Sequence, residues 1–228
     1  MKWLNKLLGK SDPSPESLVE PDDDDDGDGA FDTAWYEHKT ALFESRMGTE
    51  YDRVMHAVFP YFLGGGLDLY YYPNDIPGTG IATKELATSP TEGSTNRDFT
   101  TYELVMFTRH PVDLDAAKDD SSEFGQVHSS INAILNLIAR YSADAVLNPN
   151  ETCEFPADME NVGGKCLVFD SYAVFDDDVV DRFGLLLIME IFRSEMDFAR
   201  EHGSSELFAK LKAAGHYPYS DLDRDAVV

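Results

Sequence analysis

The stretch Thr100-Thr-Tyr-Glu-Leu-Val-Met-Phe-Thr-Arg109 decides the fold that this sequence predicts. Side chains alternate between the two faces of a β-strand, and here both faces are apolar: Tyr102, Leu104 and Met106 on one, Val105 and Phe107 on the other. A strand that is apolar on both faces must be covered on both. We therefore expect Thr100–Arg109 to be a buried central strand with helices packed on each side of its sheet.

The rest of the chain supplies further strands and the helices to cover them. Short runs rich in β-branched, aromatic or other apolar residues predict strands at 67–72, 79–88, 165–169 and 182–192. Apolar residues at helical spacing predict helices at 32–47, 49–59, 124–141, 194–202 and 204–214. Because the first three strands are joined by loops, antiparallel pairing is favoured. The expected fold class is α/β in the α+β sense: a twisted, mixed, largely antiparallel sheet flanked by helices.

Local signals set the ends of these helices. Thr49 with Asp52, and Ser194 with Asp197, have the spacing of capping boxes at helix N-termini. The three glycines at 64–66 lack the Gly-Lys-Ser/Thr of a phosphate-binding loop, so a tight turn is the favoured interpretation there.

Composition limits the classes of partner. The net charge is −25 over 228 residues, which disfavours nucleic acid and fits a basic protein partner or simple solubility. The longest apolar run, Phe183–Met189, is too short to span a membrane. Cys153 and Cys166 are expected to be free thiols, which fits a reducing, cytoplasmic location.

The first 29 residues differ in composition from the rest. Met1–Lys10 is a basic amphipathic start, for which two interpretations remain: a weak anchor to a membrane surface, or a small helix that docks on its own domain. Ser11–Gly29 is rich in Asp and Pro and reads as an acidic linker. Residues 30–228 are expected to form a single domain.

The linker also contains half of a calcium-loop pattern. Asp22, Asp24, Asp26 and Gly27 match its first positions, but position twelve, where a bidentate Glu should close the site, is Thr33. A solvated acidic linker is the favoured interpretation.

Few residues suggest catalysis. The six histidines lack the i, i+4 spacing of metal ligands on one helix, and the chain has no Gly-x-Ser-x-Gly motif, so we assign no catalytic, cofactor or metal residues. Glu103 stands out because a carboxylate in an apolar strand needs a partner or a raised pKa. A structural ion pair with Arg109, Lys84 or Arg97 is favoured over an acid–base role.

Three segments together resemble the Suppressor of fused family. Residues 102–107 (Tyr-Glu-Leu-Val-Met-Phe) resemble its Phe-Glu-Leu-Thr-Phe strand, and 135–141 (Leu-Asn-Leu-Ile-Ala-Arg-Tyr) its helix ending in Leu-Ala-Arg-Tyr. Residues 183–191, followed by Ser-Glu-Met at 194–196, resemble its Phe-Gly-Val-Val strand and the helix after it. The resemblance covers about 31–214 and implies the family's N-terminal mixed α/β domain, as in its single-domain bacterial members.

The resemblance implies protein binding without catalysis. In animals the family sequesters Gli-type transcription factors, and its bacterial members are associated with toxin systems, as immunity proteins that bind a toxin. We single out Thr83, Glu85, Glu103, Arg109 and Glu195 as candidate partner-binding residues. Two alternatives stay open: a small hydrolase-like enzyme with an unrecognised carboxylate site, and a membrane-surface scaffold held by Met1–Lys10.

Overall fold

A computed structural model describes the backbone of residues 26–228 and the side chains of residues 33–228. The basic start at Met1–Lys10, nearly all of the acidic linker and the side chains of the calcium half-loop lie outside the described residues. None of the helices in the described part of the chain is both long and apolar enough to cross a membrane.

One six-stranded sheet forms the centre of the molecule. Its strands are β1 (Tyr70–Tyr72), β2 (Thr79–Ala82), β3 (Thr101–Thr108), β4 (Thr152–Glu154), β5 (Cys166–Phe175) and β6 (Phe183–Ile191). Their order across the sheet is β1-β2-β3-β6-β5-β4, with β3 and β6 parallel and every other neighbouring pair antiparallel. Both central strands are buried along their whole length, which confirms the prediction for Thr100–Arg109.

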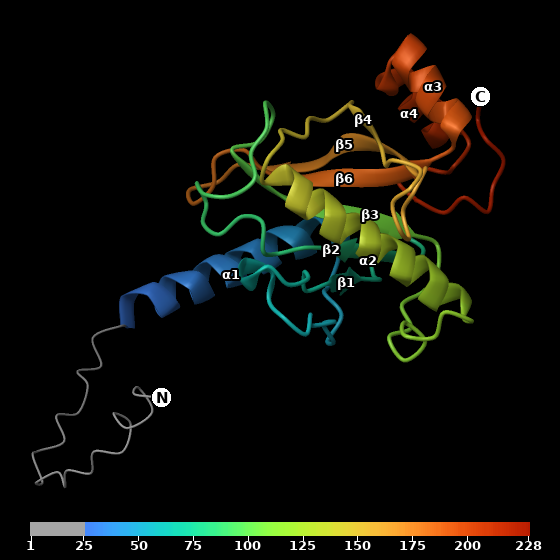
Figure 1. The fold of residues 1–228 in the computed structure, drawn as a ribbon. Helices are drawn as coiled ribbons and strands as arrows, with labels where there is room; N and C mark the ends of the chain where they lie inside the picture. The colour runs from blue at the N-terminus through green and yellow to red at the C-terminus, as the bar shows by residue number, and fades with distance from the viewer. Residues whose placement is uncertain (1–25) are drawn as a thin grey trace, which may run out of the picture.

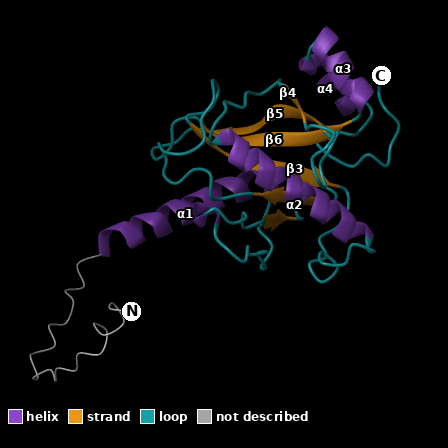
Figure 2. Ribbon diagram, in the orientation of Figure 1, coloured by secondary structure: helices purple, strands orange, loops and turns teal. Residues whose placement is uncertain are grey.

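Helices cover both faces of this sheet (Figures 1 and 2). On one face lies α2 (Glu123–Ser142), which packs against Leu104 and Met106 of β3. On the other face lie α1 (Asp26–Met47), α3 (Arg193–His202) and α4 (Ser204–Ala213), whose buried side chains share one hydrophobic core with Val105 and Phe107. The alternation of side chains along β3 thus supplies both hydrophobic cores, and the predicted mixed α/β class is confirmed.

The helix predicted at 49–59 is wrong. Tyr51 donates its backbone N–H to the carbonyl of Tyr71 at 2.8 Å, and Met55 exchanges backbone hydrogen bonds with Leu69. These residues are therefore extended along β1, where hydrogen bonds to the neighbouring chain replace those of a helix. A short 3₁₀ helix, η2 (Tyr61–Leu63), follows Pro60.

The glycines after η2 form the tight turn that the sequence predicted. Gly64 has a φ of 81°, a conformation that glycine adopts without strain. A Cβ on Gly65 would lie 1.7 Å from the carbonyl oxygen of Phe59, so this position has no room for a side chain. The turn fixes the direction of Phe59 and the residues after it.

Several boundaries differ from the prediction. Helix α1 begins at Asp26, earlier than the predicted residue 32, and β2 ends at Ala82, six residues before the predicted end. In the second half of the chain, β5 continues to Phe175, and β4 lies where no strand was predicted. Helix α3 is not capped by the pair Ser194 and Asp197; instead the carboxylate of Glu195 accepts the backbone N–H of Phe192 at 3.0 Å.

The C-terminal tail is part of the packed domain. The Asp221 carboxylate accepts hydrogen bonds from the Thr108 hydroxyl at 2.5 Å and the Arg109 backbone N–H at 2.8 Å. Arg224 makes two hydrogen bonds to Glu195, at 2.6 and 2.8 Å. The tail is thereby attached both to the end of β3 and to the start of α3.

Candidate functional site

Glu103, in the middle of β3, is fully buried and accepts hydrogen bonds from four residues. Its donors are the Lys39 ammonium at 3.0 Å, the Thr83 hydroxyl at 2.6 Å, and the backbone N–H groups of Leu86 at 3.1 Å and Ala87 at 3.0 Å. A carboxylate has about four acceptor positions, so these donors fill its capacity. Glu103 is therefore a structural acceptor, and the interpretation as an ion pair is confirmed.

The partner of Glu103 was predicted wrongly. None of the three expected cations reaches it: Lys84 pairs with Glu50, Arg97 donates to the carbonyl of Pro149, and Arg109 lies beside the C-terminal tail. The actual partner, Lys39, is 64 positions away in the sequence. It lies on α1, a helix whose spacing predicted only that it would cover the sheet.

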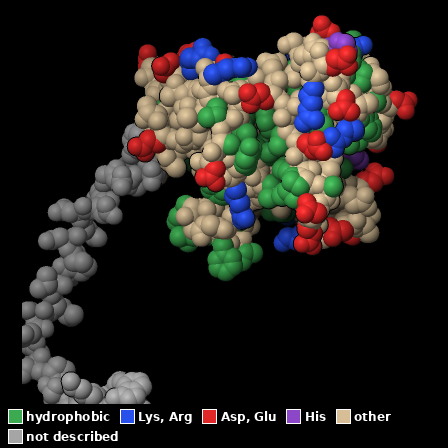
Figure 3. Space-filling view, turned by 45° about the horizontal axis from the view of Figure 1, so that its top comes forward, with side chains coloured by type: hydrophobic (Ala, Val, Ile, Leu, Met, Phe, Trp, Pro, Cys, Tyr) green, Lys and Arg blue, Asp and Glu red, His purple; other side chains and the backbone are tan. Residues whose placement is uncertain are grey.

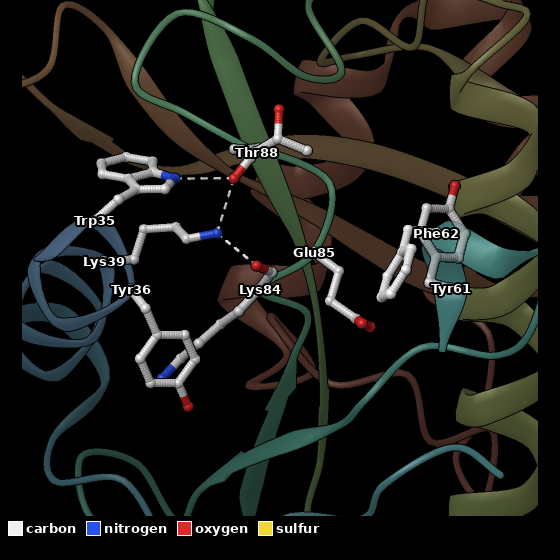
Figure 4. Close-up of a pocket in the computed structure, with 9 residues that line it drawn as sticks. Trp35, Tyr36, Lys39, Tyr61, Phe62, Lys84, Glu85 and Thr88 are labelled. Carbon is white, nitrogen blue, oxygen red and sulfur yellow. Dashed lines mark hydrogen bonds between the residues drawn. The ribbon is translucent and has the colours of Figure 1, made fainter. Parts of the chain in front are cut away.

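Lys39 also attaches α1 to the loop after β2. Its ammonium donates to the backbone carbonyl of Lys84 and, at 2.9 Å, to that of Ala87. The indole N–H of Trp35, one turn earlier on α1, donates to the same Ala87 carbonyl at 2.9 Å (Figure 4). The loop 83–88 thus donates hydrogen bonds to Glu103 of β3 and accepts hydrogen bonds from Trp35 and Lys39 of α1.

Lys84 is the second buried amine at this place. Its Nζ lies 4.4 Å from the ring centre of Tyr70 and 4.5 Å from that of Tyr36, and it donates to Glu50 at 2.5 Å and to Thr40 at 2.7 Å. Burial lowers the pKa of Lys84, and its bond to Glu50 opposes that change. Both amines are therefore engaged inside the protein rather than presented to solvent.

An open groove lies between α1, η2 and the loop 83–88. One cavity, of about 320 Å³, is lined by residues that include Trp35, Tyr36, Glu85 and Phe62 (Figure 4). A second, of about 470 Å³, shares Phe62 and Glu85 with the first and continues to residues 142–146 at the end of α2. We call these two adjoining cavities the groove.

The groove is bordered by a surface patch of large apolar side chains. Val58, Phe59, Phe62 and Leu63 are 91%, 69%, 81% and 70% exposed, and we call them the Val58–Leu63 patch. Phe59, Phe62 and Leu63 lie on the compact turn closed by hydrogen bonds from Gly65 to Pro60 and from Gly66 to Phe59, and Val58 directly precedes it. Figure 3 shows hydrophobic side chains gathered on one face of the molecule, in a central band and on a projecting lobe. Clustered exposed apolar side chains of this kind are typical of interaction surfaces.

Two carboxylates line the groove, one half-buried and one exposed. Partial burial raises the pKa of Glu85, whose carboxylate accepts the backbone N–H of Asp68 at 2.7 Å. Asp144, after the end of α2, is exposed at the far end. Because the two lysine amines are buried and paired, the charges left along this largely apolar groove are the carboxylates of Glu85 and Asp144.

The five candidate residues from the sequence fall in different places. Thr83 and Glu103 are buried beneath the groove, and Glu85 lies in it. Arg109 is attached to the C-terminal tail, and Glu195 is buried against Arg224. The structure therefore brings together Thr83, Glu85 and Glu103, and separates them from the other two.

Neither the patch nor the aromatic groove wall was predicted from the sequence. Their signal was the run Phe59-Pro-Tyr-Phe-Leu63 directly before three glycines, which cannot extend an amphipathic helix. Val58 and Phe59 were assigned to the helix predicted at 49–59, where they would be expected to face a core.

The part of the chain that the structure describes contains neither a disulfide nor a cluster of potential metal ligands. Cys153 and Cys166 are both free thiols, as predicted. Within residues 26–228, no group of three or more His, Cys, Asp or Glu side chains is placed to hold a metal ion.

Comparison with known proteins gives a likeness in fold. No family model and no curated protein matches the chain. Among solved structures, the crystal structure of the Sufu–Fu complex matches with a TM-score of 0.56 and 16% identity, over 86% of this chain and 92% of that one. The crystal structure of Drosophila Suppressor of Fused matches with a TM-score of 0.54 and 16% identity, over 84% of this chain. The chain spans half of that second protein. It therefore has a Suppressor of fused-like fold, which confirms the fold implied by the sequence resemblance.

Proposed function

We propose that this domain is a non-catalytic protein-binding domain whose contact surface is the groove together with the Val58–Leu63 patch. The observation that carries the proposal is the exposure of four large apolar side chains at residues 58–63, next to an open, largely apolar groove. Burying such side chains against a partner stabilises a complex by roughly 25 cal/mol for each Å² removed from water. Leaving them exposed has no evident structural benefit for the domain alone.

The chemistry of the groove supports binding over catalysis. Glu103 has no free acceptor position, and the amines of Lys39 and Lys84 are held by backbone carbonyls, Thr40 and carboxylates. Partial burial raises the pKa of Glu85, and no histidine or cysteine is among the described residues that line the groove. A hydrolase-like site would need a nucleophile or an activated water next to such a base.

The partner best suited to this surface is a basic protein with an apolar segment. The net charge of −25 would attract it over long range, and Glu85 and Asp144 would meet its cations at the groove. The solved Sufu–Fu structure is a complex between two proteins, a precedent for protein binding on this fold. We extend the proposal to sequestration, as in an immunity factor that covers a toxin.

Capture of a partner from the source cells tests the proposal. The tagged full chain is compared with the double variant Phe62→Ser/Leu63→Ser and with Val174→Ser, which removes a 44% exposed valine on β5 as a matched control. We expect a stoichiometric partner on the wild type and the control, less of it at higher salt, and loss of it from the double variant.

For the sequestering role, the partner should be toxic when produced alone and harmless when the wild-type chain is produced with it. Equal capture by the double variant and the wild type would contradict the assignment of the surface.

A further inference from the structure

We propose that Met1–Lys10 of the same chain docks in the groove and covers it when no other protein is bound. This contact lies within one chain and needs no external partner. It uses the groove, which is also part of the surface assigned to the proposed function. It makes the N-terminal segment a competitor for any protein that binds there.

The chemistry of the segment matches that of the groove. Written as a helix, Met1–Lys10 has Trp3, Leu4, Leu7 and Leu8 on one face, with three lysines among the other positions. An apolar helix face placed in a hydrophobic groove is a common mode of peptide recognition. The groove offers the complementary features: walls of aromatic and aliphatic side chains and the carboxylates of Glu85 and Asp144.

The linker is long enough for the segment to reach the groove. Residues 11–25, 15 residues in all, separate it from the first residue of α1. A flexible chain of this length has an r.m.s. end-to-end distance of about 20 Å. The groove begins at Trp35 and Tyr36 on α1, and ten residues of helix from Asp26 to Tyr36 correspond to about 15 Å. The two lengths are similar, so docking needs no stretching of the linker.

Attachment to the domain makes even weak binding effective. For a chain of about 15 residues treated as a random coil, the effective concentration of one end at the other is on the order of 1 mM. A segment with an intrinsic dissociation constant of about 0.1 mM would then occupy the groove about 90% of the time. An external partner with a similar segment must displace it, which lowers the apparent affinity about tenfold.

Carbodiimide cross-linking of the full chain tests where the segment lies. This reagent joins amines to carboxylates in direct contact, and mass spectrometry of the monomer band identifies the joined residues. We expect links from Lys2, Lys6 or Lys10 to Glu85 and Asp144 in the wild type and in Val174→Ser. In Phe62→Ser/Leu63→Ser these links should fall several-fold relative to links from the same three lysines to carboxylates of the acidic linker.

Fluorescence gives an independent readout, because the chain has two tryptophans and Trp35 is only 4% exposed. Quenching by acrylamide therefore reports mainly on Trp3. We expect the quenching of Trp3 to be at least about twofold stronger in the double variant than in the wild type, since about 90% occupancy shields it in the latter.

Equal quenching in both proteins, with no links between the segment and the groove, would overturn the inference. Links confined to a cross-linked dimer would overturn it in favour of docking on a second copy. Either result would leave capture of an external partner unaffected, so the two proposals can fail separately.

Discussion

Replacing Lys39 by Met should destabilise the domain, because it leaves the Glu103 carboxylate buried without its cation. Removing one partner of a buried ion pair costs about 3–5 kcal/mol. Glu103 keeps its hydrogen bonds from Thr83, Leu86 and Ala87, which places the expected loss of unfolding free energy near the lower end, about 3 kcal/mol. The methionine side chain is of similar length, so cavity formation contributes little.

Urea denaturation at neutral pH measures this loss. Lys118→Met is the matched control: its ammonium is exposed, and we expect a change within about 0.5 kcal/mol. The double variant Lys39→Met/Glu103→Gln completes a thermodynamic cycle, in which the two single losses should add up to more than the loss in the double variant. A loss below about 1 kcal/mol for Lys39→Met, or simple additivity in the cycle, would refute the role assigned to this ion pair.

Three further predictions test other parts of the structure. Gly184→Ala would place a Cβ 2.4 Å from the ring of Phe99 and should lower the unfolding free energy by about 1–3 kcal/mol, measured in urea. Gly65→Ala should weaken partner capture as strongly as the double variant Phe62→Ser/Leu63→Ser does, because its Cβ would displace the turn that carries the patch. Burial disfavours ionised Glu195, but Arg224 and two backbone N–H groups outweigh this and lower its pKa. The pair therefore stabilises the fold fully at pH values above the ordinary carboxyl pKa, and this stabilisation is lost as the pH falls through the lowered pKa of Glu195 in the folded protein. The difference in unfolding free energy between the wild type and Arg224→Met should accordingly become smaller in acid. A gap independent of pH would contradict that account.

The core of the fold could be predicted from the sequence because its signals are local. The two-faced apolar strand β3, the long amphipathic α2 and the strand β6 each carry their pattern within one continuous stretch. The helix expected at 49–59 failed for the opposite reason. Its apolar residues also suit an extended segment, and what decided between the two was pairing with Leu69 and Tyr71, which no local pattern reveals.

The candidate site was predictable only in part. The burial of Glu103 and its need for a donor follow from its position in β3, but its cation does not, because Lys39 comes from a helix 64 residues away. Glu85 was identified as a candidate and does line the groove. Phe62 was not, because its exposure depends on the turn at Gly64 and Gly65 rather than on any spacing of apolar residues.

The most direct test of the central claim is hydrogen exchange of the full chain with and without its captured partner. We predict that the partner slows exchange of backbone amides in three segments that border the groove, 58–66, 83–88 and 142–146. Amides of α3 and α4, which lie elsewhere on the molecule (Figure 1), should exchange at unchanged rates. Protection confined to α3 and α4, with the groove segments unaffected, would contradict the assignment of the groove as the protein-binding surface.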